Sequence, residues 1–165
     1  MNYEILPTKE EHIEGFWKVL DSVARERKYI AFLEGPPLER FRAFVLGNIE
    51  RKAPQFVALV EGKIVGWCDI VPSDRPVHAH CGVLGMGLMT GYRDQGIGAA
   101  LMQTSLDAAR ACGLTRVSLT VYEGNTRALE FYKKFKFQVE GIKKKDALID
   151  GVYINVISMA LLFEG

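Results

Sequence analysis

The rest of this chain is organised around the stretch CGVLGMGLMTGYRDQGIGAALMQTSLDAARAC, residues 81–112. It opens with an apolar run that Gly85 and Gly87 interrupt, and a short loop at 90–95 follows. Apolar residues then recur at helical spacing. Gly113 comes just after the last of them, where helices commonly end. We therefore predict a strand, a glycine-rich loop and a helix, in that order.

The beginning of this predicted helix is suited to binding an anion. The first N–H groups of a helix lack intrahelical partners and carry a partial positive charge, so they bind phosphate readily. Gly96 and Gly98 have no Cβ atoms and allow a close approach to the backbone, and Arg93 adds a charge. Glycines within a strand indicate a bulge or a close neighbour. We expect an extended ligand with a phosphate group.

Two common phosphate loops do not fit this stretch. The nucleotide P-loop needs G-x-x-x-x-G-K-[ST], and Gly91 and Gly96 have its spacing. The next two residues are Ile97-Gly98, however, so the lysine and the magnesium-binding hydroxyl are missing. The dinucleotide fingerprint G-x-G-x-x-G also fails, because 85–87 is followed by a glycine only at Gly91. We exclude both.

Composition predicts one globular domain, residues 1–165, because 165 residues that are 48% hydrophobic can bury a sizeable core. The net charge of +1 argues against strong attraction to nucleic acid or an anionic membrane. Cys68, Cys81 and Cys112 form no C-x-x-C pair and indicate a reduced compartment. No signal pattern opens the chain, and no apolar run approaches the roughly 20 residues of a membrane span. We expect a soluble, cytoplasmic protein.

Hydrophobic periodicity and turn residues predict the remaining elements. Strands are expected at 2–6, 55–60, 63–71, 81–89, 115–122, 137–145 and 152–162, and helices at 9–27, 38–52, after Gly98 and at 125–135. Two-residue turns are expected at Glu61-Gly62 and Asp150-Gly151. The order predicts an α+β domain with a mixed sheet of about seven strands and four helices. The strands at 81–89 and 115–122 should be parallel, joined by a right-handed crossover.

Two local features of the first helices can also be predicted. Thr8 and Glu11 match the S/T-x-x-E capping box and should begin the first helix. The apolar face of the second helix should consist of Phe41, Val45, Leu46 and Ile49.

Two motifs carry a family resemblance. RDQGIG, residues 93–98, resembles the R-x-x-G-x-G/A pyrophosphate loop of the GNAT superfamily of acetyl-CoA-dependent N-acetyltransferases. NTRALEFYKKFKF, residues 125–137, resembles the family's N-x-x-A-x-x-x-Y-x-x-x-G-F, with Lys136 in place of the glycine. If that position needs a positive φ, Lys136 costs about 1 kcal/mol or more. The predicted element order also matches, so the resemblance covers nearly the whole chain. Residues 144–159 resemble bacterial members that acetylate free amino acids or small amines.

The resemblance implies parallel strands splayed around the cofactor, acetyl-CoA. It implies that the backbone of Leu88 and Met89 pairs with the pantetheine arm. It implies that the pyrophosphate is held by Arg93, Asp94, Gln95, Gly96, Ile97, Gly98 and Ala99, and that Asn125 and Tyr132 complete the cofactor site. We expect Arg93 to act mostly by ordering the loop, because the backbone supplies most of the donors.

Tyr132 is the predicted general acid. It lies seven residues after Asn125, so the two share one helix face. A phenol with a pKa near 10 can protonate a leaving thiolate whose pKa is roughly 8.5. The matching tyrosine is the proposed acid of the family. The alternative is a half-buried tyrosine that only packs on the sheet.

The general base has several candidates. Many relatives place a glutamate on the strand before the loop, but 83–89 contains no carboxylate. Glu123, Asp69, His78 and His80 are the candidates, and Glu123 comes first because it lies two residues before the second motif. A chain of water molecules to bulk solvent is the leading alternative to a side chain.

Other polar and aromatic clusters have simpler interpretations. Residues 78–81, HAHC, lack a fourth zinc ligand at suitable spacing, so we expect no metal. Residues 143–145, KKK, should protect an edge strand, with an acidic partner or the coenzyme 3′-phosphate as alternatives. Tyr29, Phe32 and Trp67 could form the wall of an acceptor pocket, although Trp67 also suits the core.

The sequence therefore predicts an enzyme that moves the acetyl group of acetyl-CoA to a primary amine of a small molecule, such as an amino acid. One alternative is acetylation of a protein N-terminus or lysine. The other is an acyl-CoA-binding regulatory module without turnover, against which Asn125 and Tyr132 argue. The apolar strand at 153–163 makes a homodimer possible.

Overall fold

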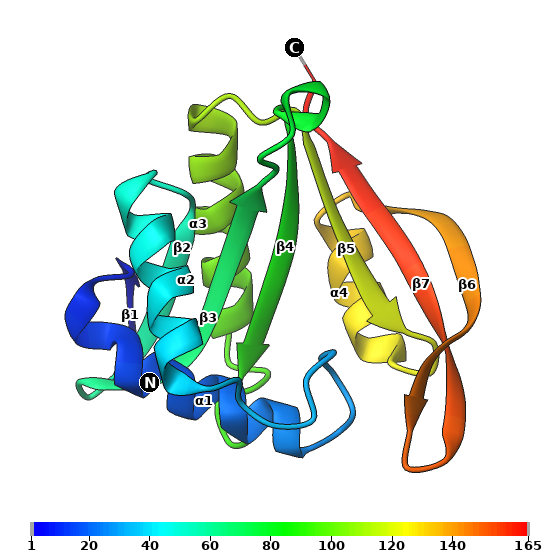
Figure 1. Ribbon diagram of the computed structural model, residues 1–165, viewed down its shortest axis with the longest axis horizontal. Helices are drawn as coiled ribbons and strands as arrows, with labels where there is room; N and C mark the ends of the chain where they lie inside the picture. The colour runs from blue at the N-terminus through cyan, green and yellow to red at the C-terminus, as the bar shows by residue number, and fades with distance from the viewer. Residues whose placement is uncertain (1, 165) are drawn as a thin grey trace.

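A mixed seven-stranded sheet forms the centre of the structure, a computed structural model that describes residues 2–164 (Figure 1). Its strand order is β1-β2-β3-β4-β5-β7-β6. The strands are β1 (Glu4–Pro7), β2 (Gln55–Val60), β3 (Lys63–Pro72), β4 (Cys81–Leu88), β5 (Arg116–Tyr122), β6 (Gln138–Ile149) and β7 (Val152–Leu162). The helices are α1 (Ile13–Arg25), α2 (Leu38–Glu50), α3 (Ile97–Ala111) and α4 (Thr126–Lys134), with 3-10 turns η1 (Glu10–His12) and η2 (Pro76–His78). The predicted fold class is confirmed.

Two tight turns join the antiparallel hairpins where the sequence predicts them. Glu61 and Gly62 connect β2 to β3 with φ values of 50° and 77°. Asp150 and Gly151 connect β6 to β7 with φ values of 50° and 78°. Positive φ at both central residues is typical of type I′ turns, whose twist matches that of the flanking strands.

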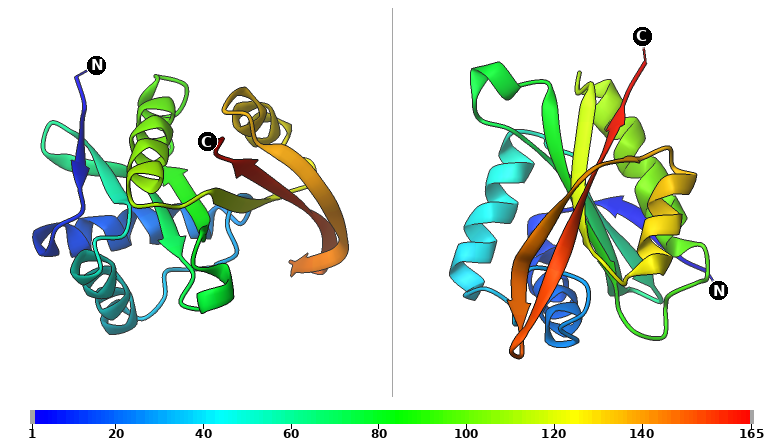
Figure 2. Two further views of the ribbon diagram at one scale, coloured as in Figure 1. Left: turned by 90° about the horizontal axis from the view of Figure 1, so that it is seen from above. Right: turned by 90° about the vertical axis from the view of Figure 1, so that its right-hand side faces the viewer.

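Helices cover both faces of the sheet (Figure 2). α1 and α2 pack on β2, β3 and β4 from one side, and their core contains Phe16, Phe41 and Trp67. α3 packs on the opposite face, and α4 joins it there against β5 and β7. Leu101 and Met159 are fully buried in this second core. The two cores therefore hold the sheet between two helical layers.

The parallel pair β4 and β5 separates soon after it begins. The strands pair only between 81–83 and 116–118, and the gap beyond them is visible in Figure 1. α3 connects the two strands, which confirms the predicted crossover. Because β5 turns away, the remaining edge of β4 faces an opening instead of a neighbouring strand.

The first helix begins differently from the prediction. The Thr8 hydroxyl donates to the Gln55 carbonyl at 3.1 Å and does not cap the helix. The Lys9 N–H donates instead to His12 Nδ1 at 3.0 Å, and a 3-10 turn precedes α1. The capping box predicted for Thr8 and Glu11 is wrong. Thr8 is buried against β2, and its hydroxyl donates a hydrogen bond to the Gln55 carbonyl there instead of capping the helix.

The buried face of α2 also differs from the prediction. Phe41 and Val45 are buried as expected, but Leu46 and Ile49 are 36% and 37% exposed. Asn48 is buried in their place, at 1% exposure. The face that meets the sheet follows i, i+4 and i+7 from Phe41, and this spacing excludes the other two apolar residues.

The turn after α4 contains the predicted departure from the family glycine. Asn125 caps this helix as expected, because its Oδ1 accepts from the Ala128 N–H at 3.3 Å. Lys136 then adopts a φ of 75°, in the left-handed region. Lys136→Gly is therefore expected to raise the free energy of unfolding by about 1 kcal/mol, because glycine adopts this conformation without a Cβ penalty. Urea unfolding measures the change.

The matched control is Lys133→Gly, which places the same substitution inside α4. There glycine should lower stability by roughly 1 kcal/mol. A destabilised Lys136→Gly variant would show that contacts of the lysine side chain outweigh the strain of its backbone.

Candidate functional site

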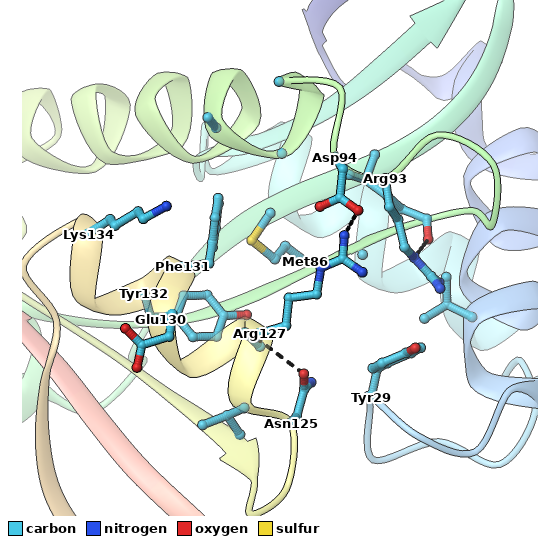
Figure 3. Close-up of a pocket in the computed structure, with 18 of the residues that line it drawn as sticks. Tyr29, Met86, Arg93, Asp94, Asn125, Arg127, Glu130, Phe131, Tyr132 and Lys134 are labelled. Atoms are coloured by element: carbon cyan, nitrogen blue, oxygen red, sulfur yellow. Dashed lines mark hydrogen bonds and ion pairs between the residues drawn. The ribbon is translucent and has the colours of Figure 1, made fainter.

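A cavity of about 480 Å³ opens where β4 and β5 diverge (Figure 3). Five segments contribute to it: α1 with the loop after it, β4, the loop and first turn of α3, β5, and α4. Its lining residues are Val23, Tyr29, Met86, Gly87, Leu88, Arg93, Asp94, Gly96, Gly98, Ala99, Thr120, Val121, Asn125, Arg127, Ala128, Glu130, Phe131, Tyr132 and Lys134. Most of the predicted site residues are therefore brought to one place.

The free edge of β4 faces this cavity. The Met89 N–H donates to the Val65 carbonyl at 2.9 Å, so the backbone at Met89 points toward β3. Alternation along a strand then directs the backbone of Met86 and Leu88 to the opposite edge, toward the gap. Leu88 lies where the sequence predicts, whereas Met89 packs against the α1 core and is absent from the cavity lining. Met86 takes its place.

The two glycines of β4 are explained by side chains of β3. The strands pair without a register shift, so there is no bulge between them. A Cβ at Gly87 would lie 2.6 Å from Cη2 of Trp67, a clash, and a Cβ at Gly85 would lie 3.3 Å from Oδ1 of Asp69. Trp67 is only 5% exposed and packs on Phe16, so it belongs to the core and not to the cavity wall.

The first turn of α3 forms an anion cradle in the cavity. Gly96 caps the helix with a φ of 86°, and the Ala100 N–H makes the first intrahelical bond, to the Gly96 carbonyl. The N–H groups of residues 97–99 therefore have no acceptor inside the helix. A Cβ at Gly98 would meet Leu88 and Phe131 of the cavity lining at 3.4 and 3.8 Å. This bare, N–H-rich surface fits a pyrophosphate group.

Other residues of this loop have structural contacts. Gln95 Nε2 donates to the Gly91 carbonyl at 2.9 Å, and Ile97 is fully buried, so neither side chain lines the cavity. Asp94 has a φ of 62° and forms an ion pair with Arg127 of α4, across the cavity (Figure 3). Only the backbone of Gln95 and Ile97 could contact a ligand here.

Arg93 connects the loop to the end of α1. Its guanidinium donates to both carboxylate oxygens of Glu26, at 3.0 and 2.6 Å, and to the Leu88 carbonyl at 3.0 Å. It also lies 4.7 Å from the centre of the Tyr29 ring. The hydrogen bond from Arg93 lowers the pKa of Glu26, so the carboxylate stays ionised. These contacts support the expected role of Arg93 in ordering the loop.

Asn125 and Tyr132 face the same cavity from α4. The Asn125 amide oxygen is used as the helix cap, so this residue also fixes where α4 begins. The Tyr132 ring packs against Phe131 and Phe137, with ring centres 5.6 and 5.9 Å away. Burial raises the pKa of the Tyr132 hydroxyl, so the phenol remains a proton donor throughout the physiological range.

The loop between α1 and α2 closes one side of the cavity. Tyr29 lines the cavity, whereas Phe32 is 47% exposed and lies outside the lining. The Tyr122 hydroxyl at the end of β5 donates to the Ile30 carbonyl at 3.0 Å, and Arg27 pairs with Asp150. The loop is thus attached to β5 and to the β6–β7 turn.

The four candidates for the general base lie in different environments. Glu123 is exposed just beyond β5 and is not among the lining residues. His78 and His80 are exposed before the start of β4, at the end of that strand away from the cavity. Asp69 is 7% exposed, and burial raises its pKa to about 6, although the hydrogen bond from Gln55 acts in the opposite direction.

The buried Asp69 predicts a pH dependence of stability. An unfolded aspartate has a pKa near 3.9, so the folded state, with a pKa of about 6, binds this proton more tightly. Stability should therefore fall as the pH rises from about 4 to about 6, by about 3 kcal/mol in all. Asp69→Asn cannot ionise and should lack this fall. Urea unfolding of both proteins across the range isolates the difference, and parallel curves would contradict it.

Several lining residues are missing from the sequence prediction. Arg127, Ala128 and Phe131 lie on the turns of α4 that carry Tyr132, so extending the helix face would have found them. Met86 and Thr120 could not be found in this way, because their exposure to the cavity depends on where β4 and β5 separate.

Within residues 2–164, no three or more histidine, cysteine, aspartate and glutamate side chains gather as a metal site would require. The helices of this same part of the chain are all too short or too polar to cross a membrane.

Comparisons with known proteins agree on one family. Residues 17–137 match the sequence model described as Acetyltransferase (GNAT) family. The chain is 33% identical over 107 residues to the L-amino acid N-acetyltransferase AaaT of Escherichia coli, across 64% of this chain and 66% of that protein. A GNAT-family acetyltransferase from Streptococcus pneumoniae superposes with a TM-score of 0.91 at 25% identity, covering 98% of this chain and 100% of that one. A Salmonella typhimurium acetyltransferase, solved with its cofactor acetyl-CoA, gives 0.92 at 13% identity, covering 100% and 96%.

Proposed function

Because this chain belongs to the GNAT family of acetyltransferases, we propose that it moves the acetyl group of acetyl-CoA to the primary amine of a small molecule such as an amino acid. The observation that carries the proposal is the cavity between β4 and β5, which combines a free strand edge, a bare helix N-terminus and Tyr132. A strand edge can pair with an extended amide-containing arm, and a helix N-terminus can hold a pyrophosphate.

The residues of the cavity suggest how the co-substrate is held. We assign the pyrophosphate to the backbone of residues 94–99 and the pantetheine arm to Leu88 and Met86. Acetyl-CoA supplies an acetyl group activated as a thioester. Tyr132 then donates a proton to the leaving sulfur, and Asn125 holds the start of α4 so that this hydroxyl stays in the cavity. Desolvation weakens the phenol as an acid, but it also raises the proton affinity of a thiolate in the same cavity.

Glu123 is the base proposed from the sequence. It is exposed just beyond β5 and is not among the lining residues, so it is a candidate base at the rim of the cavity. The amine itself would enter from the side of the α1–α2 loop, where Tyr29 and Val23 line the cavity. The likeness to an L-amino acid acetyltransferase favours a small acceptor.

The decisive experiment is an assay of thiol release from acetyl-CoA. Purified protein is given a panel of L-amino acids, simple amines, and peptides with a free N-terminus or an internal lysine. Turnover with the amino acids or amines supports the proposal. Turnover with peptides alone would instead indicate a protein acetyltransferase. Tight acetyl-CoA binding without any turnover would indicate a regulatory module.

Three further expectations from the sequence are also proposals. We propose that residues 1–165 act as one acetyltransferase domain, because the family match spans residues 17–137 and all seven strands belong to one sheet. We propose a cytoplasmic location, because Cys68, Cys81 and Cys112 all carry free thiols. Near-neutral net charge gives no support for nucleic acid or membrane partners, and the chemistry needs no metal.

We propose a second copy of the chain as the partner of β6 and β7. β6 is the edge strand, and Val139, Ile142 and Leu148 on it are each about half exposed. Tyr153 of β7, the register partner of Leu148, is also exposed and extends this apolar surface. Lys143–Lys145 lie on the same edge strand, as predicted, and would limit its pairing with other proteins. Sedimentation velocity of the wild type and of Ile142→Lys tests the proposal: a wild-type monomer contradicts it.

A further inference from the structure

Asp69 lies beside the point where the cavity begins. On β4 and β5, Val83 is opposite Ser118, so two residues further along Gly85 is level with Thr120, which lines the cavity. Asp69 is the partner of Gly85 on the other side, and its Oδ1 would be only 3.3 Å from a Cβ at Gly85. Because Gly85 has no side chain, this carboxylate can lie against the backbone of β4 at the start of the gap between the strands.

The side chain of Asp69 is on the face from which an acceptor would enter. Asp69 and Trp67 are two residues apart on β3 and therefore share a face of the sheet. Trp67 packs on Phe16 of α1, which identifies that face as the one covered by α1 and α2. Val23 and Tyr29 line the cavity from the same side, opposite to α3 and its anion cradle. Asp69 is not itself a lining residue; it lies on this side of the sheet level with Gly85, directly before the lining residues Met86 and Gly87.

The carboxylate is held in place by a neutral partner. Gln55 Nε2 donates to Asp69 Oδ2 at 3.0 Å, and the Gly85 backbone also stabilises the charge. Cys68 is the adjacent titratable group, and burial raises the pKa of its thiol to about 12, so it stays neutral. A buried carboxylate with only amide partners keeps its affinity for a proton, whereas one paired with arginine loses it.

A second cavity is lined by Gln55, the hydrogen-bond partner of this carboxylate. It has a volume of about 300 Å³ between α2, β1 and β2, and both Gln55 and Asn48 line it. Gln55 Oε1 and Asn48 Nδ2 are buried there without a hydrogen-bond partner. Polar atoms in this situation are usually satisfied by water. Water bonded to Gln55 would lie next to the Asp69 carboxylate and could exchange protons with it.

We propose that Asp69 is the group that accepts the proton of the acceptor amine, directly or through one water molecule. This assignment rests on the proposed N-acetylation. The amine nitrogen forms a bond to the acetyl carbonyl carbon, and the bond from that carbon to sulfur breaks. The nitrogen proton passes to Asp69, and the sulfur leaves with the electron pair and receives the Tyr132 proton. Asp69 then returns a proton through solvent to the Tyr132 phenolate, which balances the cycle.

The test compares Asp69→Asn with the wild type, using the panel acceptor that the wild type acetylates fastest. We expect kcat/KM to fall by about 100-fold or more, the usual scale for a general base, with acetyl-CoA affinity unchanged by calorimetry. Asp107→Asn is the matched control, because this exposed aspartate on α3 accepts from Gln103 as Asp69 does from Gln55. The control should match the wild type. Near wild-type activity of Asp69→Asn, or a loss confined to Glu123→Gln, overturns the assignment.

The pH profile of the wild type gives a readout that needs no folded variant. With Asp69 as the base, kcat/KM should rise as the pH passes through about 6. The pH of this rise should not change when a less basic acceptor is used, such as an amino acid amide in place of the amino acid. Gln55→Leu should move it to higher pH, because the lost hydrogen bond stabilised the carboxylate. A profile that only follows the ionisation of the amine overturns the proposal and indicates a water chain.

Activity with peptides alone would refute the small acceptor but leave this comparison intact. No turnover with any acceptor would refute both.

Discussion

Tyr132→Phe is expected to lower turnover by roughly 10- to 1000-fold while acetyl-CoA affinity stays within a few-fold, the pattern of a lost acid catalyst. The hydroxyl faces the cavity that holds the anion cradle, and burial raises its pKa, so in the wild type it always carries the proton to be donated. The ring contacts with Phe131 and Phe137 remain in the variant. Single-turnover kinetics, under conditions where chemistry limits the rate, measure the effect.

The control for this prediction is Tyr3→Phe, which removes a hydroxyl from a residue that is 38% exposed near the start of the chain. Its turnover should equal that of the wild type. If Tyr132→Phe also turns over at the wild-type rate, the hydroxyl is not the acid and the tyrosine has only a packing role on α4.

Gly98→Val is expected to weaken acetyl-CoA binding by about 2 kcal/mol or more, roughly 30-fold, on the scale of several lost charge-assisted hydrogen bonds. A side chain at Gly98 would project toward Leu88 and Phe131, inside the cavity. The first Cβ atom would make ordinary contacts there, at 3.4 Å and beyond, so the fold should tolerate the substitution. The two methyl groups of valine would then occupy the space in front of the N–H groups of α3.

Calorimetry with acetyl-CoA tests this prediction, with Gly47→Val as the matched control. Gly47 is also inside a helix, and nothing lies within 4 Å of a Cβ built on it, so the same substitution on α2 leaves the cavity unchanged. Gly98→Ala should give an intermediate loss. Unchanged affinity in a folded Gly98→Val protein would remove the α3 N-terminus from the binding site.

The contacts of Arg93 suggest that the cofactor and acceptor sides of the cavity are mechanically connected. One guanidinium bonds Leu88 of β4 and Glu26 after α1, and it also stacks on Tyr29. The position of the anion cradle therefore depends on contacts with the loop that would cover the amine. A bidentate arginine–carboxylate pair that is only partly exposed is a stronger connection than a surface ion pair.

Local sequence patterns determined most of the fold. The turns at 61–62 and 150–151, the Asn125 cap and the strand–loop–helix at 81–112 follow from short-range preferences that tertiary packing did not change. The positive φ of Lys136 agrees with the glycine that the family motif has at this position. The anion cradle belongs to this group as well, since a glycine-rich helix N-terminus is a property of the sequence itself.

The wrong prediction for Thr8, and the exchange of Met89 for Met86, depend on partners distant in the chain. Thr8 does not cap its helix because its hydroxyl donates to the carbonyl of Gln55, which is 47 residues away in the sequence. Met86 reaches the cavity and Met89 does not, because the Met89 N–H is hydrogen-bonded to Val65 of β3. Strands, turns and the glycine-rich start of α3 follow from the sequence, since these features depend on neighbours in the chain. The burial of Asp69 beside Gly85 at the start of the gap is a result of the tertiary fold, because burial and proton affinity depend on segments that the fold brings together.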